Sequence, residues 1–181
     1  MFKHIIVKYE ENYDTSRLNE GIVNHCNMYT DRFMKDISRF GYAKMLELVK
    51  EVFKEDLRDE EIIFEGKPRF ATKTNIFFNI SHEDNLLAII VADKECGIDL
   101  CRRVTNVKLA EKILSEEEYN EFQASSDKEE YIARKWAMKE AYAKWMGTGL
   151  NEKIFKTTVK VRISDVKFGE KNYYLCIKCD D

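Results

Sequence analysis

Residues 134–147 carry the side chains whose types and spacing are best suited to chemistry. Counting in fours, Trp136, Glu140 and Lys144 fall on one face of a helix, about 6 Å apart along its axis. A carboxylate therefore has an amine one helical turn away. Such a pair is either an ordinary surface ion pair, worth only ~0.3–0.5 kcal/mol, or half of a functional site. A second site residue elsewhere in the chain has to decide between them.

Asp99 is the second candidate, because it lies between Ile98 and Leu100, where the strand pattern is apolar. A carboxylate in such a place must be paired, hydrogen-bonded or bound to a cation. Two interpretations stay open at this point: Asp99 begins a turn before the basic residues 102–103, or it is a ligand. On a strand, Asp99 and Cys101 share a face about 7 Å apart.

The amino-acid composition limits the classes of protein to which this chain can belong. A chain of 181 residues with 44% hydrophobic residues is expected to fold as one globular unit. The net charge of −3 supplies no positive field for a nucleic acid. The longest apolar run, Leu86–Ala92, is too short to cross a membrane. No signal-peptide pattern follows Met1, and the five irregularly spaced cysteines suit free thiols, so we expect a cytoplasmic protein. Cys176 and Cys179 match C-x-x-C, but their alternating apolar surroundings favour a strand.

Hydrophobic periodicity predicts an α+β fold. Helices are expected from residue 15 or 16 to 23 and at 31–53, 106–114, 116–122 and 127–147. Strands are expected at 2–9, 62–64, 77–82, 86–92, 96–101, 155–164 and 172–179. The near-continuous apolarity of Leu86–Ala92 predicts a strand covered on both faces. Since helices and three strands occur in each half, the pattern permits two similar lobes, 1–95 and 96–181.

Three segments then line up in chain order. They are Gly66–Pro68 with Phe78–His82 (FNISH), Gly97–Leu100 (GIDL), and Trp136–Lys144 (WAMKEAYAK) followed by Gly147–Leu150 (GTGL). In this order they resemble the 4'-phosphopantetheinyl transferases, specifically the larger single-chain type that activates surfactin synthetase. The resemblance covers about Asp36 to Leu150, and its specificity comes from the second and third blocks together.

The resemblance implies a reaction and a fold. The family transfers the phosphopantetheine arm of coenzyme A to a serine of an acyl or peptidyl carrier protein and releases 3',5'-ADP. Its fold is a pseudo-dimer of two α+β lobes, with the active site in the inter-lobe cleft. By position, Asp99 and Glu140 would bind Mg²⁺, Glu140 could also accept the serine proton, and Lys144 would steady the departing phosphate.

The resemblance also assigns contacts to coenzyme A. Lys67, His82 and Lys139 would bind its phosphates, and Ser81 would support them. Arg39 with Phe40 would lie by the adenine nucleotide, although its neighbours alone favour Arg39 as a surface residue with a buried stem. Glu118 matches a recurring F/L-S-x-x-E turn of the family, without an assigned role.

One departure from the family pattern concerns the metal. Most relatives carry a second acid two residues after the aspartate, where this chain has Cys101. A neutral thiol is a poor Mg²⁺ ligand, so either a water, Glu83 or another acid completes the shell, or the metal is bound more weakly. The leading hypothesis is an active monomeric transferase. The alternatives are a non-catalytic coenzyme A- or carrier-binding homologue, and an unrelated α+β protein whose charged helix is a solvated face.

Overall fold

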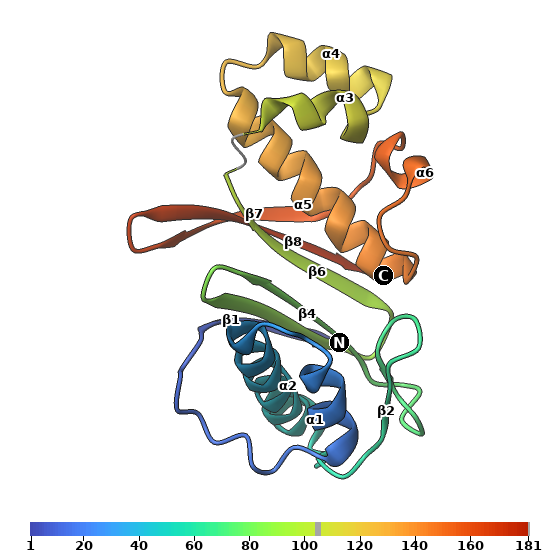
Figure 1. Ribbon diagram of the computed structural model, residues 1–181. Helices are drawn as coiled ribbons and strands as arrows, with labels where there is room; N and C mark the ends of the chain where they lie inside the picture. The colour runs from blue at the N-terminus through green and yellow to red at the C-terminus, as the bar shows by residue number, and fades with distance from the viewer. Residues whose placement is uncertain (104–105, 181) are drawn as a thin grey trace. The chain divides into compact units, whose positions relative to one another are not determined.

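The computed structural model describes residues 1–103 and 106–180, and it confirms the α+β class (Figure 1). The chain divides into two compact units. Unit 1 comprises Met1–Cys96 with Asp180, and unit 2 comprises Gly97–Cys179. Each unit has a three-stranded sheet and helices of its own. That the two units form one globular body, with the active site in a cleft between them, stays a prediction.

The sheet of unit 1 has the strand order β1-β5-β4, and its pairings are antiparallel. Its strands are β1 (Phe2–Lys8), β4 (Phe77–Glu83) and β5 (Leu86–Ala92). All seven residues of the central strand β5 are buried, as the apolar run predicts. A short hairpin of β2 (Ile62–Ile63) and β3 (Arg69–Phe70) carries Gly66 at φ 76° in its turn.

Two helices complete unit 1. The long helix α2 (Arg32–Phe53) is capped by Asp31 and packs against β4 and β5. The shorter α1 (Glu20–Asn27) begins later than predicted, and the expected caps Thr15 and Ser16 are wrong. Asn19 caps it instead, because its side chain accepts from the Ile22 N–H while its amide group donates to the carbonyls of residues 58 and 60.

The sheet of unit 2 has the order β6-β8-β7, and α5 (Lys128–Met146) packs against it (Figure 1). Its strands are β6 (Cys96–Arg102), β7 (Arg162–Phe168) and β8 (Lys171–Cys179). The predicted strand 155–164 is wrong for residues 155–161, since β7 begins at Arg162. Residues Glu152–Phe155 form the short helix α6, because Asn151 caps it by accepting from the Ile154 N–H.

The remaining helices of unit 2 lie before α5. A 3₁₀ turn η1 (Val107–Leu109) and α3 (Ala110–Ile113) replace the single helix predicted at 106–114. The next helix, α4 (Glu116–Ala124), starts with the capping box of Ser115 and Glu118. Asp127 caps α5, and Gly147 ends it in the left-handed region at φ 69°. No helix in the described residues is long and apolar enough to span a membrane.

Candidate functional site

A close approach between β6 and α5 builds the site in unit 2. A Cβ atom at Gly97 would lie 2.2 Å from the Ala141 carbonyl oxygen and 2.5 Å from the Trp145 backbone nitrogen. Only glycine allows strand and helix to come this close. Residues two apart on a strand share a face, so Asp99 and Cys101 follow Gly97 on the side that meets α5. The sequence contained this signal, a glycine within an apolar strand, but the contact that requires it is visible only in the fold.

Asp99 and Lys144 form an ion pair on this face. Lys144 Nζ lies 2.7 Å from Asp99 Oδ1, and the Asp99 side chain is only 8% exposed. A nearly buried carboxylate needs such a partner, since an unpaired one would lose its hydration without compensation. Asp99 lies within β6, so the interpretation that it begins a turn is wrong, and its role as a ligand stays a prediction.

Glu140 completes a group of three charged side chains. Burial raises the pKa of Glu140, the ammonium group of Lys144 lowers it, and the negative charge of Asp99 raises it again. Both neighbours act on Glu140 electrostatically, so the structure brings together all three residues that were predicted to be catalytic. Glu140 and Lys144 are thus more than a solvated surface pair.

The donor chemistry of this group fits Mg²⁺. Two carboxylates within electrostatic reach of one another offer hard oxygen ligands, and a divalent cation would offset both the loss of hydration and the repulsion from Asp99 that raise the pKa of Glu140. No group of three or more His, Cys, Asp or Glu side chains suited to a metal occurs in the described part of the chain. The other ligands would have to be waters and substrate oxygens, which Mg²⁺ usually retains.

Cys101 occupies the position of the missing second acid. It is 6% exposed and packs in an apolar cluster with Ala133, Ala137 and Ala141. Its Sγ donates to the backbone carbonyl of Arg102 at 3.0 Å. This environment suits a small apolar side chain and would penalise a carboxylate. Glu83, one of the alternatives for completing the metal shell, belongs to unit 1, and its role stays a prediction.

Lys139 is placed differently from the expected phosphate ligand. Its side chain is 0% exposed, and Nζ lies 2.7 Å from Glu118 Oε2. Nζ also donates to the carbonyls of Phe155 at 2.7 Å and Thr157 at 2.8 Å. Glu118, which sequence reasoning left without a role, is therefore the partner of Lys139.

Five of the predicted coenzyme A contacts lie in unit 1. Lys67 Nζ binds Glu95 Oε2 at 2.5 Å and the Cys96 carbonyl at 2.7 Å. Ser81 is buried and His82 is exposed, and as neighbours on β4 they point to opposite faces of the sheet. Arg39 Nη2 donates to Asn27 Oδ1 at 2.7 Å. Since these residues belong to unit 1, their joining with Asp99 in one site stays a prediction.

Phe40, the remaining predicted contact in unit 1, is a core residue. It is 1% exposed and makes edge-to-face contacts with Tyr9 and Tyr13, at ring-centroid distances of 5.6 Å and 5.0 Å. A ring enclosed in this way stabilises α2 and has no free face for an adenine base. We therefore assign Phe40 a packing role and keep Arg39, which lines a surface pocket beside it, as the candidate nucleotide contact.

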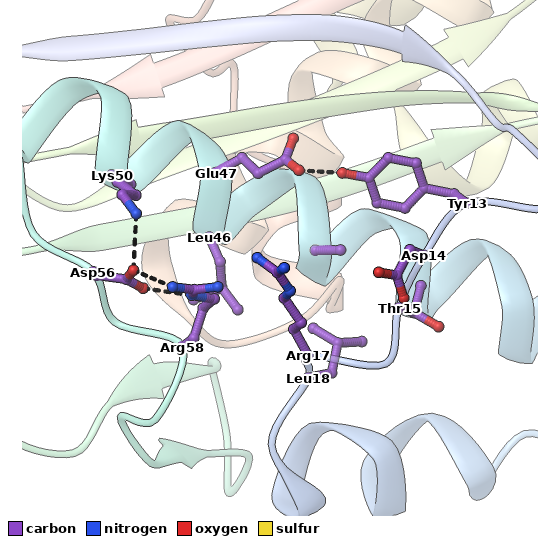
Figure 2. Close-up of a pocket in the computed structure, with 11 residues that line it drawn as sticks. Tyr13, Asp14, Thr15, Arg17, Leu18, Leu46, Glu47, Lys50, Asp56 and Arg58 are labelled. Atoms are coloured by element: carbon purple, nitrogen blue, oxygen red, sulfur yellow. Dashed lines mark hydrogen bonds and ion pairs between the residues drawn. The ribbon is translucent and has the colours of Figure 1, made fainter.

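A pocket lined by α2, by residues 13–18 before α1 and by residues 56–58 after α2 was not expected from the sequence (Figure 2). Most of its charges are matched. Asp56 accepts from Lys50 at 2.9 Å and from Arg58 at 2.7 Å, and Tyr13 donates to Glu47. Because these charges satisfy each other on the surface, the pocket supplies no reacting group, and we assign it no catalytic part.

Comparison with known proteins relates the chain to one superfamily. The model of the 4'-phosphopantetheinyl transferase superfamily matches residues 95–176, which is nearly all of unit 2. The chain is 30% identical over 139 residues to 4'-phosphopantetheinyl transferase psf-1 of Bacillus pumilus, covering 72% of this chain and 59% of that protein. It is 29% identical over 100 residues to 4'-phosphopantetheinyl transferase of Bacillus subtilis, covering 54% and 45%.

A holo-[acyl-carrier-protein] synthase of Thermotoga maritima is 40% identical over 75 residues, which are 40% of each chain. The chain thus spans from 40% to 59% of the length of these three relatives. The resemblance to the 4'-phosphopantetheinyl transferase superfamily is confirmed, and it is concentrated on the unit that carries Asp99, Glu140 and Lys144.

Proposed function

We propose that the protein transfers the 4'-phosphopantetheine group of coenzyme A to a serine of an acyl or peptidyl carrier protein, releasing 3',5'-ADP. The observation that carries this proposal is the grouping of Asp99, Glu140 and Lys144 where β6 meets α5. The names of the similar proteins supply the reaction class. The proposed activity is that of a holo-[acyl-carrier-protein] synthase type transferase.

In this reaction the serine oxygen attacks the phosphorus that carries pantetheine. A new phosphorus–oxygen bond forms to serine, and the bond to the phosphate of 3',5'-ADP breaks. Asp99 and Glu140 would hold Mg²⁺, which supplies charge stabilisation for the pyrophosphate when bound. The Glu140 carboxylate can accept the serine proton, and the Lys144 ammonium group can balance the charge that develops on the leaving phosphate.

We also propose coenzyme A contacts from Arg39, Lys67, Ser81, His82 and Lys144, action as a monomer, and a cytoplasmic location. The location is supported by the odd number and irregular spacing of the five cysteines, which suit a reducing compartment. The partners would be the apo-carrier protein and coenzyme A, without nucleic acid or membrane.

An intact-mass assay tests the activity. The protein is incubated with coenzyme A, Mg²⁺ and a panel of apo-carrier proteins of acyl, peptidyl and aryl type. We expect at least one carrier to gain the mass of a single phosphopantetheine group, and the gain to disappear when the metal is chelated. No mass change on any carrier, with an authentic transferase modifying the same samples, would contradict the proposal.

Cys101 favours one alternative, a non-catalytic homologue that binds coenzyme A or a carrier. In that case wild-type protein would bind coenzyme A in calorimetry but leave every carrier unmodified. Cys101→Glu provides the comparison, since a restored acid should then confer transfer. If wild-type protein already transfers, we expect Cys101→Glu to lower activity, because the new carboxylate enters the alanine cluster.

A further inference from the structure

The buried ion pair of Lys139 and Glu118 is the feature of unit 2 that the proposed reaction does not use. Their side chains are 0% and 1% exposed, and the charged atoms are 2.7 Å apart. Buried pairs of this kind often contribute little net stability compared with apolar residues of similar volume. A geometric role therefore has to be considered.

The hydrogen bonds of Lys139 leave no donor for a ligand. An ammonium group has three N–H donors. Glu118 Oε2, the Phe155 carbonyl and the Thr157 carbonyl lie at 2.7 Å, 2.7 Å and 2.8 Å from Nζ, and the Ile154 carbonyl is farther away at 3.4 Å. Lys139 thus binds the carboxyl end of α6 and the start of the next segment, where backbone carbonyls lack helical partners.

Glu118 carries the connection to the neighbouring helices. Its Oε2 also accepts from the Ser115 N–H at 3.0 Å, within the capping box that starts α4. Lys156, which follows α6, donates to the carbonyls of Glu111 and Leu114 at 3.0 Å each. One side of α5 is thereby tied to α4 and α6, and through Lys156 to α3.

The site residues Glu140 and Lys144 lie on another side of α5. Adjacent residues on a helix are about 100° apart, so holding Lys139 fixes the direction in which Glu140 points. Lys144 follows one turn after Glu140 and reaches Asp99 at 2.7 Å. A rotation of α5 about its axis would move both site residues relative to β6 while leaving the apolar contacts of the alanines partly intact.

We propose that Lys139 and Glu118 are positioning residues, which set the rotation of α5 and so aim Glu140 and Lys144 at the reacting phosphate. Lys139 does not bind a coenzyme A phosphate in this account. The inference rests on the proposed transfer function and assigns a role within the same site.

A double-mutant cycle tests the proposal, with Lys139→Met, Glu118→Gln and their combination. The quantities are kcat, KM for coenzyme A and the calorimetric Kd for 3',5'-ADP, all measured well below the unfolding midpoint of every variant. We expect each single variant to lower kcat about 10- to 100-fold, since misplacement by an ångström has effects of this size. KM and Kd should stay within about twofold, because binding is left intact. The double variant, which buries no unpaired charge, should recover part of kcat.

Lys135→Met is the matched control, because Lys135 lies one turn before Lys139 and approaches Glu118 Oε1 at 3.5 Å without being fully buried. It should leave kcat unchanged. If Lys139→Met does not fold, Lys139→Arg keeps the charge with a different reach and should show the same kcat loss at unchanged Kd. A more than tenfold rise in the Kd for 3',5'-ADP with unchanged kcat would make Lys139 a phosphate ligand and overturn the proposal. Single variants with wild-type kcat would also overturn it. If the wild-type protein transfers no phosphopantetheine to any carrier, the proposed function itself is refuted instead.

Discussion

Units 1 and 2 are built from similar elements but differ in their interiors. Unit 1 has one large apolar core, with aromatic side chains such as Phe40, Phe70 and Phe78. Unit 2 has smaller clusters, one of them rich in alanine. In the described part of the chain, every buried charged side chain lies in unit 2: Asp99, Glu118 and Lys139. Burying charge opposes folding unless it is paired, so unit 2 retains groups that stability alone would not select.

The two units are therefore stabilised by different kinds of interaction. Unit 1 is stabilised mainly by the burial of apolar surface. Unit 2 is held partly by ion pairs and backbone contacts that also orient reactive groups. Mutations should therefore affect stability most in unit 1 and turnover most in unit 2.

The largest effects are expected at the charged group of unit 2. Asp99→Ala and Glu140→Ala should abolish measurable transfer, because each removes a metal ligand in the proposed site. Lys144→Ala should slow transfer a few hundred-fold, since one charge contact to a phosphoryl transition state is commonly worth ~3–4 kcal/mol. Intact-mass time courses measure the rates, and Glu116→Ala, an exposed acid on α4, serves as the control. Wild-type rates in the Asp99 and Glu140 variants would refute this site.

The core of unit 1 should show the largest loss of stability. Phe70 is 2% exposed and lies against Phe78 at a ring-centroid distance of 5.2 Å. Phe70→Ala should lower the free energy of unfolding by about 3–5 kcal/mol, because it removes a buried ring and leaves a cavity. Urea titration measures this change. The combined Lys139→Met and Glu118→Gln variant should lose less, and an equal or larger loss would mean that unit 2 depends on its ion pair as unit 1 depends on its core.

The contact between strand and helix should show an intermediate effect. Gly97→Ala would place a methyl group 2.2 Å from the Ala141 carbonyl, so β6 and α5 must separate. We expect a loss of about 1–3 kcal/mol in the free energy of unfolding, together with reduced transfer. Gly21→Ala on α1 is the control, because its nearest heavy atom would be 3.4 Å away. Equal stability in the two variants would show that Gly97 is not needed for close packing.

The smallest effect concerns pH and unit 1. Burial lowers the pKa of His25, whose ring stacks on Phe64 at 3.8 Å between centroids. The unfolded state then binds a proton more readily, so stability is complete above the unfolded pKa of about 6.5 and falls as the pH drops below it. Urea midpoints at pH values on either side of about 6.5 measure the change. His25→Gln should reduce this pH dependence, and an unchanged dependence would assign it to other groups.

The sequence predicted most of the elements that place the site. The apolar run Leu86–Ala92 is the buried central strand, and the helix bearing Glu140 and Lys144 has its predicted cap at Asp127 and end at Gly147. Local patterns suffice in these cases, because periodicity and capping residues act over a few positions. Asp99 was detectable since a charge among apolar strand residues requires a partner.

Long-range contacts explain what sequence patterns missed. Nothing in the spacing of Glu118 and Lys139 shows that they meet inside unit 2, and the basic residue was read as a phosphate ligand. The start of α1 depends on Asn19 reaching the backbone at residues 58 and 60. The helix α6 ends at Phe155, where a strand was predicted to begin, and the Phe155 carbonyl accepts a hydrogen bond from Lys139 of α5.

The most direct test of the central claim compares wild-type protein with Asp99→Asn on one apo-carrier, with coenzyme A and Mg²⁺ in excess. Asparagine keeps the size of the side chain but removes the charge that pairs with Lys144. Intact-mass analysis should show one phosphopantetheine group on the carrier with wild-type protein and none with the variant. Equal modification by both proteins would contradict the assignment of transfer to the charged group of unit 2.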